Sequence, residues 1–69
     1  MEKIYSLTDR KGDVYNLSES SYLELMRDLN SSKAFVTVKV SWGVDSEGEH
    51  MLDEIVMNKD YIIKIREIK

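Results

Sequence analysis

Residues 17–29 carry the only strong helical pattern in a chain whose other segments have the patterns of strands and turns. The apolar residues of this segment recur at the i, i+3, i+4 and i+7 spacing of a helix with one buried face: Tyr22, Leu25, Met26 and Leu29. Ser18 is suited to cap the first turn, and Ser21 with Glu24 forms a competing capping box. One short helix with a single apolar stripe needs a sheet to pack against, which constrains the fold of the whole chain.

Strand patterns surround this helix on both sides. The predicted strands are residues 3–8, 14–17, 33–42, 51–57 and 61–68. The third is the clearest, because strict alternation puts five apolar side chains on one face: Ala34, Val36, Val38, Val40 and Trp42. Short polar turns separate the strands, with Gly12 in the first turn and Gly48 in the acidic loop after Trp42.

The order of these elements is ββαβββ, which predicts an α+β domain. Consecutive strands joined by short turns favour antiparallel pairing, as a hairpin and a meander. We therefore expect one domain over residues 1–69, with a small antiparallel sheet or partial barrel covered by the one helix.

Composition excludes several classes of function. The chain has no Cys and a single His, so the sequence predicts no disulfide, no zinc site built on Cys or His, and no cofactor. Its net charge of −3 has the wrong sign for general binding to phosphate. No apolar run has the length of a membrane span, and the first residues lack a signal-peptide core, so a cytoplasmic protein with no membrane partner is expected.

The acidic segment that follows Trp42 is the first candidate site. Its carboxylates come without an intervening Lys or Arg: Asp45, Glu47, Glu49, Asp53 and Glu54. Three interpretations are open, namely a solvated loop, a divalent-cation site and a negative surface that contacts a basic partner. The spacing does not match the calcium-loop pattern. Trp42 is either packed at the edge of the core or a contact anchor for a partner, because Trp is enriched at binding hot spots.

The outer face of the sheet is the second candidate. If the valines of residues 36–40 point toward the helix, seven residues are expected to share the opposite face: Phe35, Thr37, Lys39, Ile62, Lys64, Arg66 and Ile68. Four of them are the candidate contacts for a phosphate-bearing ligand: Phe35, Lys39, Lys64 and Arg66. Such a face can hold a nucleotide or a nucleic acid, with cations on phosphate and an aromatic ring to stack on a base. It can also form a homodimer surface, to which Phe35, Ile62 and Ile68 would contribute.

Catalysis finds little support in the sequence. Ser18, Ser20 and Ser21 are explained by helix capping, and nothing in the sequence relates them to His50. No phosphate loop, dinucleotide fingerprint or nucleophile elbow is present. We therefore predict that the protein is not an enzyme.

The layout resembles small accessory proteins of bacteriophages and prophages. The resemblance rests on the folding signals in residues 3–7, 11–13, 17–22 and 57–65, and it covers most of the chain. It implies a compact binding protein of the kind that inhibits bacterial defence systems, such as the anti-CRISPR proteins, with a bacterial protein as its target. The alternatives are a homo-oligomer that sequesters a nucleotide or nucleic acid, and a structural or assembly subunit.

Overall fold

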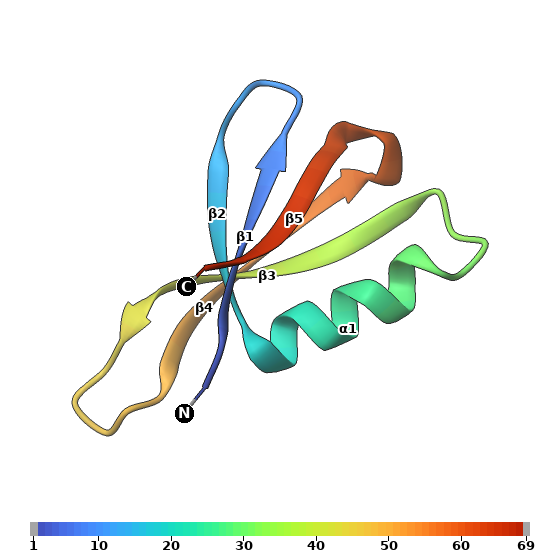
Figure 1. The fold of residues 1–69 in the computed structure, drawn as a ribbon. Coiled ribbons are helices and arrows are strands. Elements are labelled where there is room, and N and C mark those ends of the chain that lie inside the picture. The colour runs from blue at the N-terminus through green and yellow to red at the C-terminus, as the bar shows by residue number, and fades with distance from the viewer. Residues whose placement is uncertain (1, 69) are drawn as a thin grey trace.

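The computed structural model describes residues 2–68, which form five strands, one α-helix and one short 3₁₀ helix (Figure 1). In chain order these are β1 (Ile4–Asp9), β2 (Val14–Ser18), α1 (Glu19–Leu29), β3 (Phe35–Val44), β4 (His50–Asn58), η1 (Lys59–Tyr61) and β5 (Ile62–Ile68). The α+β class and the ββαβββ order predicted from the sequence are confirmed.

The strands form two antiparallel sheets, with the order β2-β1-β5 in one and β3-β4 in the other. The two predicted hairpins, β1 with β2 and β3 with β4, are confirmed. The predicted meander from β4 into β5 is wrong, because β5 pairs with β1. The helix α1 runs along β3 and also packs against β2, so it holds the two sheets together from one side (Figure 1).

The 3₁₀ helix η1 explains why β5 leaves the sheet of β4. At its start, the amide of Lys59 donates to the carbonyl of Ala34, just before β3, at 3.0 Å. At its end, the carbonyl of Tyr61 accepts from the amide of Arg10, in the turn after β1, at 3.0 Å. The turn is therefore fixed to one sheet at its beginning and to the other at its end, and it delivers the chain to β1.

A register shift in β5 also changes which of its side chains face inward. Thr8 of β1 lies opposite Lys64, but the next residue, Asp9, lies opposite Ile62, so Ile63 is an extra residue on β5. Ile62 packs against the core, whereas the side chain of Ile63 is 58% exposed. Strict alternation predicted that Ile62 lies on the outer face. That prediction is wrong because the bulge reverses the phase of the strand.

The helix begins where the sequence predicts. The hydroxyl of Ser18 accepts from the amide of Ser21 at 3.3 Å, which makes Ser18 the N-cap and excludes the competing start. Leu25 is almost fully buried. Tyr22 stacks on Tyr5 of β1, with ring centroids 3.7 Å apart and an interplanar angle of 4°. The apolar stripe of the helix is therefore used for packing.

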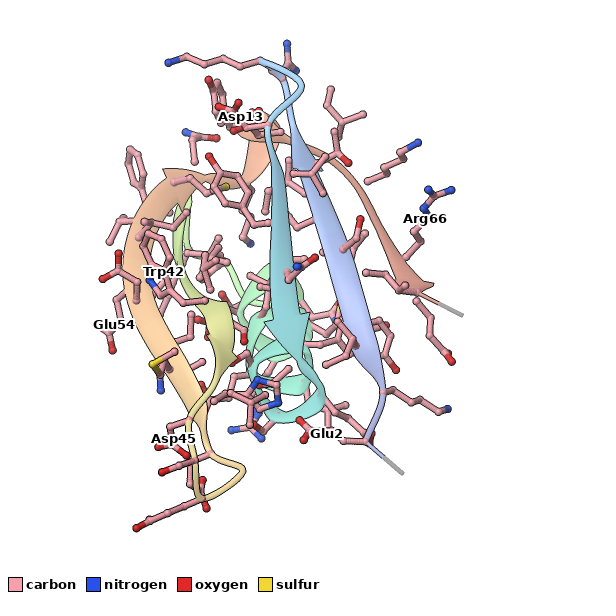
Figure 2. The ribbon with its side chains drawn as sticks, turned by 90° about the vertical axis from the view of Figure 1, so that its left-hand side faces the viewer. Glu2, Asp13, Trp42, Asp45, Glu54 and Arg66 are labelled. Carbon is pink, nitrogen blue, oxygen red and sulfur yellow. The ribbon has the colours of Figure 1, made fainter. Side chains whose placement is uncertain are left out.

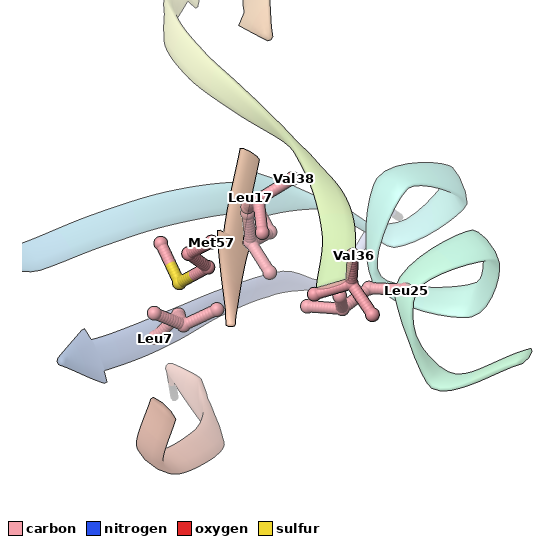
Figure 3. Packing of buried hydrophobic residues seen from close by; sticks show 6 residues of the cluster. All are labelled: Leu7, Leu17, Leu25, Val36, Val38 and Met57. Carbon is pink, nitrogen blue, oxygen red and sulfur yellow. The ribbon is translucent and has the colours of Figure 1, made fainter. Parts of the chain in front are cut away.

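The core is small and draws one or two side chains from each of five elements. It consists of Leu7, Leu17, Leu25, Val36, Val38 and Met57 (Figure 3). Burying a side chain of this kind contributes about 1.5–3 kcal/mol. A core of six such residues leaves little reserve in a 69-residue chain.

The inner face of β3 is buried only over its first half. Val36 and Val38 are fully buried, Val40 is half-buried, and Trp42 is 72% exposed. The ladder between β3 and β4 nevertheless continues to the pair of Val44 with His50. The hairpin thus extends past the core, and Figure 1 shows its tip projecting away from the helix.

Within residues 2–68, no helix is long and apolar enough to cross a membrane.

Candidate partner-binding surface

We call residues 40–53 the distal hairpin, which comprises the end of β3, the connecting loop and the start of β4. Its tip is a tight turn shaped by Asp45, whose Oδ1 accepts from the amides of Glu47 at 2.9 Å and Glu49 at 3.0 Å. Gly48 has a φ of +84°, a conformation that favours glycine. Asp45 is therefore needed for the turn itself, while Glu47 and Glu49 are exposed at the tip.

A register shift between Ser41 and Gly43 brings Trp42 to the surface of the distal hairpin. The sequence left open whether Trp42 packs at the core edge or is available to a partner, and its 72% exposure favours availability. Three further large apolar side chains of the distal hairpin are about half exposed: Val44, Met51 and Leu52. Exposed apolar residues that gather on one element are typical of an interaction surface.

The electrostatic character of this hairpin is uniformly negative. The five carboxylates of residues 45–54 were predicted as one surface, but the structure distributes them over the tip and both faces of the β3–β4 hairpin. Asp53 lies opposite Val40 on the inner face, whereas Glu54 lies opposite Lys39 on the outer face. Figure 2 shows Asp45 near the tip and Glu54 pointing outward from β4. Residues 40–58 contain no Lys or Arg to neutralise this charge.

A groove of about 290 Å³ opens between β2 and the inner face of the β3–β4 hairpin. Its lining is Val14, Tyr15, Asn16, Val40, Ser41, Trp42, Asp53 and Ile55. Two of the six predicted contact residues, Trp42 and Asp53, therefore lie in a groove with β2. The contribution of β2 could not be predicted, because no local pattern indicates which strand of the first hairpin faces the second hairpin.

A row of polar side-chain contacts that was not predicted from the sequence lies at the base of the distal hairpin. The Oγ of Ser41 is 2.8 Å from Nδ1 of His50, and Nε2 of His50 is 3.2 Å from Oε1 of Glu2. The same Glu2 oxygen accepts from the amide of Glu19 at 3.3 Å, at the start of α1. These contacts tie the distal hairpin to the N-terminal segment and to the helix.

The three side chains in these contacts, Ser41, His50 and Glu2, are the residue types of a serine hydrolase triad. In such triads the hydroxyl contacts Nε2 of the histidine and the acid contacts Nδ1, which is the reverse of the arrangement here. Acyl transfer also needs amide donors aimed at the developing oxyanion. Ser41 instead lies within the β3–β4 ladder, opposite Leu52. The geometry therefore favours a structural tether.

The alternative basic surface is divided between the two sheets. Phe35 and Lys39 belong to β3, whereas Lys64 and Arg66 belong to β5. Lys39 lies opposite Glu54 in the ladder, and Figure 2 shows Glu54 and Arg66 on opposite sides of the molecule. The structure thus does not bring the four predicted residues onto one face.

Lys39 is also engaged within the fold. Its Nζ lies 3.1 Å from Oε2 of Glu24 on α1. The hydrogen bond to Glu24 raises the pKa of Lys39 above its usual value, and the charges of Glu24 and then Glu54 raise it further. This ammonium group already has two carboxylates near it, which makes it a poor site for a phosphate.

The described part of the chain offers no metal centre. Among residues 2–68, no three His, Cys, Asp or Glu side chains gather in a way that could hold a metal ion. The interpretation of the acidic segment as a divalent-cation site therefore has no support from the geometry.

No protein-family model, curated protein or solved structure matches this chain.

Proposed function

We propose that the protein is a non-enzymatic binding protein that docks the distal hairpin onto a basic surface of another protein. One observation carries the proposal: Trp42, the only Trp of the chain, is largely exposed on a hairpin that has four carboxylates and no Lys or Arg. A large apolar anchor surrounded by charge of one sign suits a partner with an apolar pocket and a positive rim.

Electrostatics also argue for a partner other than a second copy at this hairpin. Two copies meeting there would bring carboxylates against carboxylates, and like charges in contact oppose association. A basic partner gains in two ways, because the negative field steers the encounter and exposed apolar area is removed from water afterwards.

The identity of the target rests on resemblance. Small phage accessory proteins act on bacterial proteins, and many act against defence systems. We therefore propose a bacterial defence or host protein as the target and the bacterial cytoplasm as the place of action. A nucleic-acid-binding target fits this scheme, because such proteins display the positive surfaces that a negative hairpin would contact.

The test combines affinity capture with charge reversal. The tagged protein is used to capture partners from a bacterial lysate, and each captured protein is purified and its affinity measured by calorimetry. E47K/E49K is expected to weaken binding at least about tenfold, because it reverses two exposed charges at the tip. Trp42→Ala should weaken binding by a similar factor through loss of the apolar anchor.

The matched control is D13K/D60K, which makes the same change in net charge at other exposed positions. Figure 2 shows Asp13 at the opposite end of the molecule from Asp45. If the control weakens binding as much as E47K/E49K, the attraction depends on net charge alone and the proposed surface is wrong. Unchanged binding by both hairpin variants would contradict the proposal as well.

The non-enzymatic part of the proposal has its own measurement. A fluorophosphonate probe labels serines that an adjacent base activates. We expect Ser41 to stay unlabelled at neutral pH, as judged by mass spectrometry of the intact protein. Labelling of wild type that His50→Ala abolishes would instead identify a hydrolase.

A further inference from the structure

We propose that the groove between β2 and the distal hairpin receives an arginine side chain of the partner. This inference rests on the proposed function, because it identifies which residue of a basic partner the hairpin recognises. The groove combines a mostly apolar lining with a single acidic group, the carboxylate of Asp53.

The size of the groove indicates a side chain as its occupant. Pockets for whole small molecules usually measure about 300–1,000 Å³ and enclose most of the ligand. This groove, at about 290 Å³, lies just below that range and is open to solvent. A single long side chain entering from a docked partner fits this space.

The chemistry of the lining selects a cation with an apolar stem. Val40 and Ile55 provide aliphatic surface for methylene groups, and Trp42 presents an exposed aromatic ring. Asp53 adds a carboxylate on the same face as Val40. Arginine satisfies all three features, because its guanidinium group stacks on aromatic rings and pairs with carboxylates in a fork geometry.

Tyr15 forms a fixed wall on the β2 side. Its hydroxyl donates to Oδ2 of Asp9 at 3.0 Å, which holds the side chain from its far end. Asp9 is itself buried and accepts from the amides of Lys11 and Asp13 in the β1–β2 turn. A wall held in this way loses little conformational freedom when a ligand binds, which favours affinity.

The probe for this proposal is N-acetyl-L-arginine amide, with N-acetyl-L-citrulline amide as its uncharged isostere. Binding is followed by ¹⁵N–¹H correlation spectra of the full chain, in which the indole N–H of Trp42 gives the only signal of its kind. We expect arginine amide to shift the Trp42 indole and the Asp53 amide in a saturable way at millimolar concentration. Citrulline amide should bind at least about threefold more weakly, because it lacks the charge that pairs with Asp53.

The matched variants are Asp53→Asn and Glu54→Gln. They make the same change in net charge at adjacent positions whose side chains lie on opposite faces of β4. Asp53→Asn should reduce the affinity for arginine amide by at least about threefold, the size expected of one exposed ion pair, and Glu54→Gln should leave it unchanged. The proposal is overturned by equal effects of the two variants, by equal affinity for arginine and citrulline amides, or by the absence of saturable shifts.

The two proposals fail in distinguishable ways. If the arginine probe does not bind but E47K/E49K still abolishes capture of a partner, the distal hairpin is the binding surface and the groove is not its arginine site. If the probe binds with the expected dependence on Asp53 but no purified partner depends on the hairpin, the proposed function is wrong while the arginine site remains.

Discussion

At the scale of single residues, buried Asp9 shows how one carboxylate can organise a turn. Its Oδ1 accepts from the amides of Lys11 at 2.9 Å and Asp13 at 3.0 Å, and its Oδ2 accepts from the hydroxyl of Tyr15. A buried carboxylate would be costly without such donors. The sequence pointed to Gly12 as the turn signal, but the partners of Asp9 fix the shape of the hairpin and one wall of the groove.

The contact between Tyr15 and Asp9 predicts a loss of stability in alkali. The hydrogen bond to Asp9, followed by burial, raises the pKa of Tyr15 above its usual value near 10. A raised pKa in the folded state means that the contribution is fully present below the unfolded pKa and is lost as the pH rises through the folded pKa. The melting temperature should therefore fall as the pH rises above about 10 and the phenol ionises beside a carboxylate.

Tyr15→Phe tests this assignment. The variant should be less stable by about 1 kcal/mol at pH 7, and the gap to wild type should narrow above pH 10. Thermal unfolding followed by circular dichroism across this pH range measures both effects. Tyr22→Phe, which removes a hydroxyl without touching Asp9, is the control. A gap that stays constant with pH for Tyr15→Phe would contradict the assignment.

At the scale of elements, local signals predicted more than long-range pairing. The cap at Ser18 and both hairpins follow from residues close together in the sequence, and all three are confirmed. The pairing of β5 with β1 is not local, and the sequence pattern of β5 would suit either neighbour. The bulge at Ile63 could not be predicted from the local sequence either, because it depends on the register of β5 against β1.

In the candidate site, too, single residues could be predicted from the sequence, whereas contacts between distant elements could not. Trp42 and Asp53 were predicted to contact a partner, and the structure places both in one groove. Tyr15 and Asn16 complete that groove from an element more than twenty residues earlier, so no spacing motif relates them. The contact between Ser41 and His50 was missed for a similar reason, since it depends on the register of β3 against β4.

The helix offers a matched pair of leucines for testing how the core holds the two sheets together. Leu25 is 1% exposed and belongs to the core cluster, whereas Leu23 is 57% exposed on the same helix. Leu25→Ala should cost about 2–5 kcal/mol, because it removes buried area and leaves a cavity. Leu23→Ala should change stability by less than about 0.5 kcal/mol, since surface substitutions usually do.

Urea denaturation followed by far-ultraviolet circular dichroism measures both variants. A domain of this size has only a few kcal/mol of stability, so Leu25→Ala is expected to be largely unfolded without urea. If the two variants unfold at similar urea concentrations, the helix does not pack on β3 through the Leu25 face.

At the scale of the whole molecule, the two sheets pack on each other through β2 and β3 and a shared core, and α1 and η1 bridge them. The principal extents of 36 × 22 × 19 Å describe an elongated body. A second apolar surface lies on the outer face of β3–β4, where Phe35 and Val56 are 59% and 69% exposed. Both side chains project from the face that carries Lys39 and Glu54.

This outer face is the best candidate for the self-association predicted from the sequence. The three residues predicted to form a homodimer surface, Phe35, Ile62 and Ile68, do not lie together. Ile62 packs against the core, and Ile68 belongs to the other sheet. Unlike the distal hairpin, the outer face carries both a cation and an anion beside its apolar residues. A two-fold axis can place such a face against itself with opposite charges in contact.

Sedimentation velocity over about 10 μM to 1 mM is expected to show a weak dimer, since small isologous contacts seldom give tight complexes. Val56→Lys should shift the distribution to monomer, because it adds a charge at the centre of the apolar patch. Ile63→Lys is the matched control: it puts the same residue at a similarly exposed apolar position on β5, in the other sheet, and should leave the dimer intact. A wild-type protein that stays monomeric at 1 mM would remove self-association from the properties of this fold, and equal disruption by both lysines would place the dimer contact elsewhere.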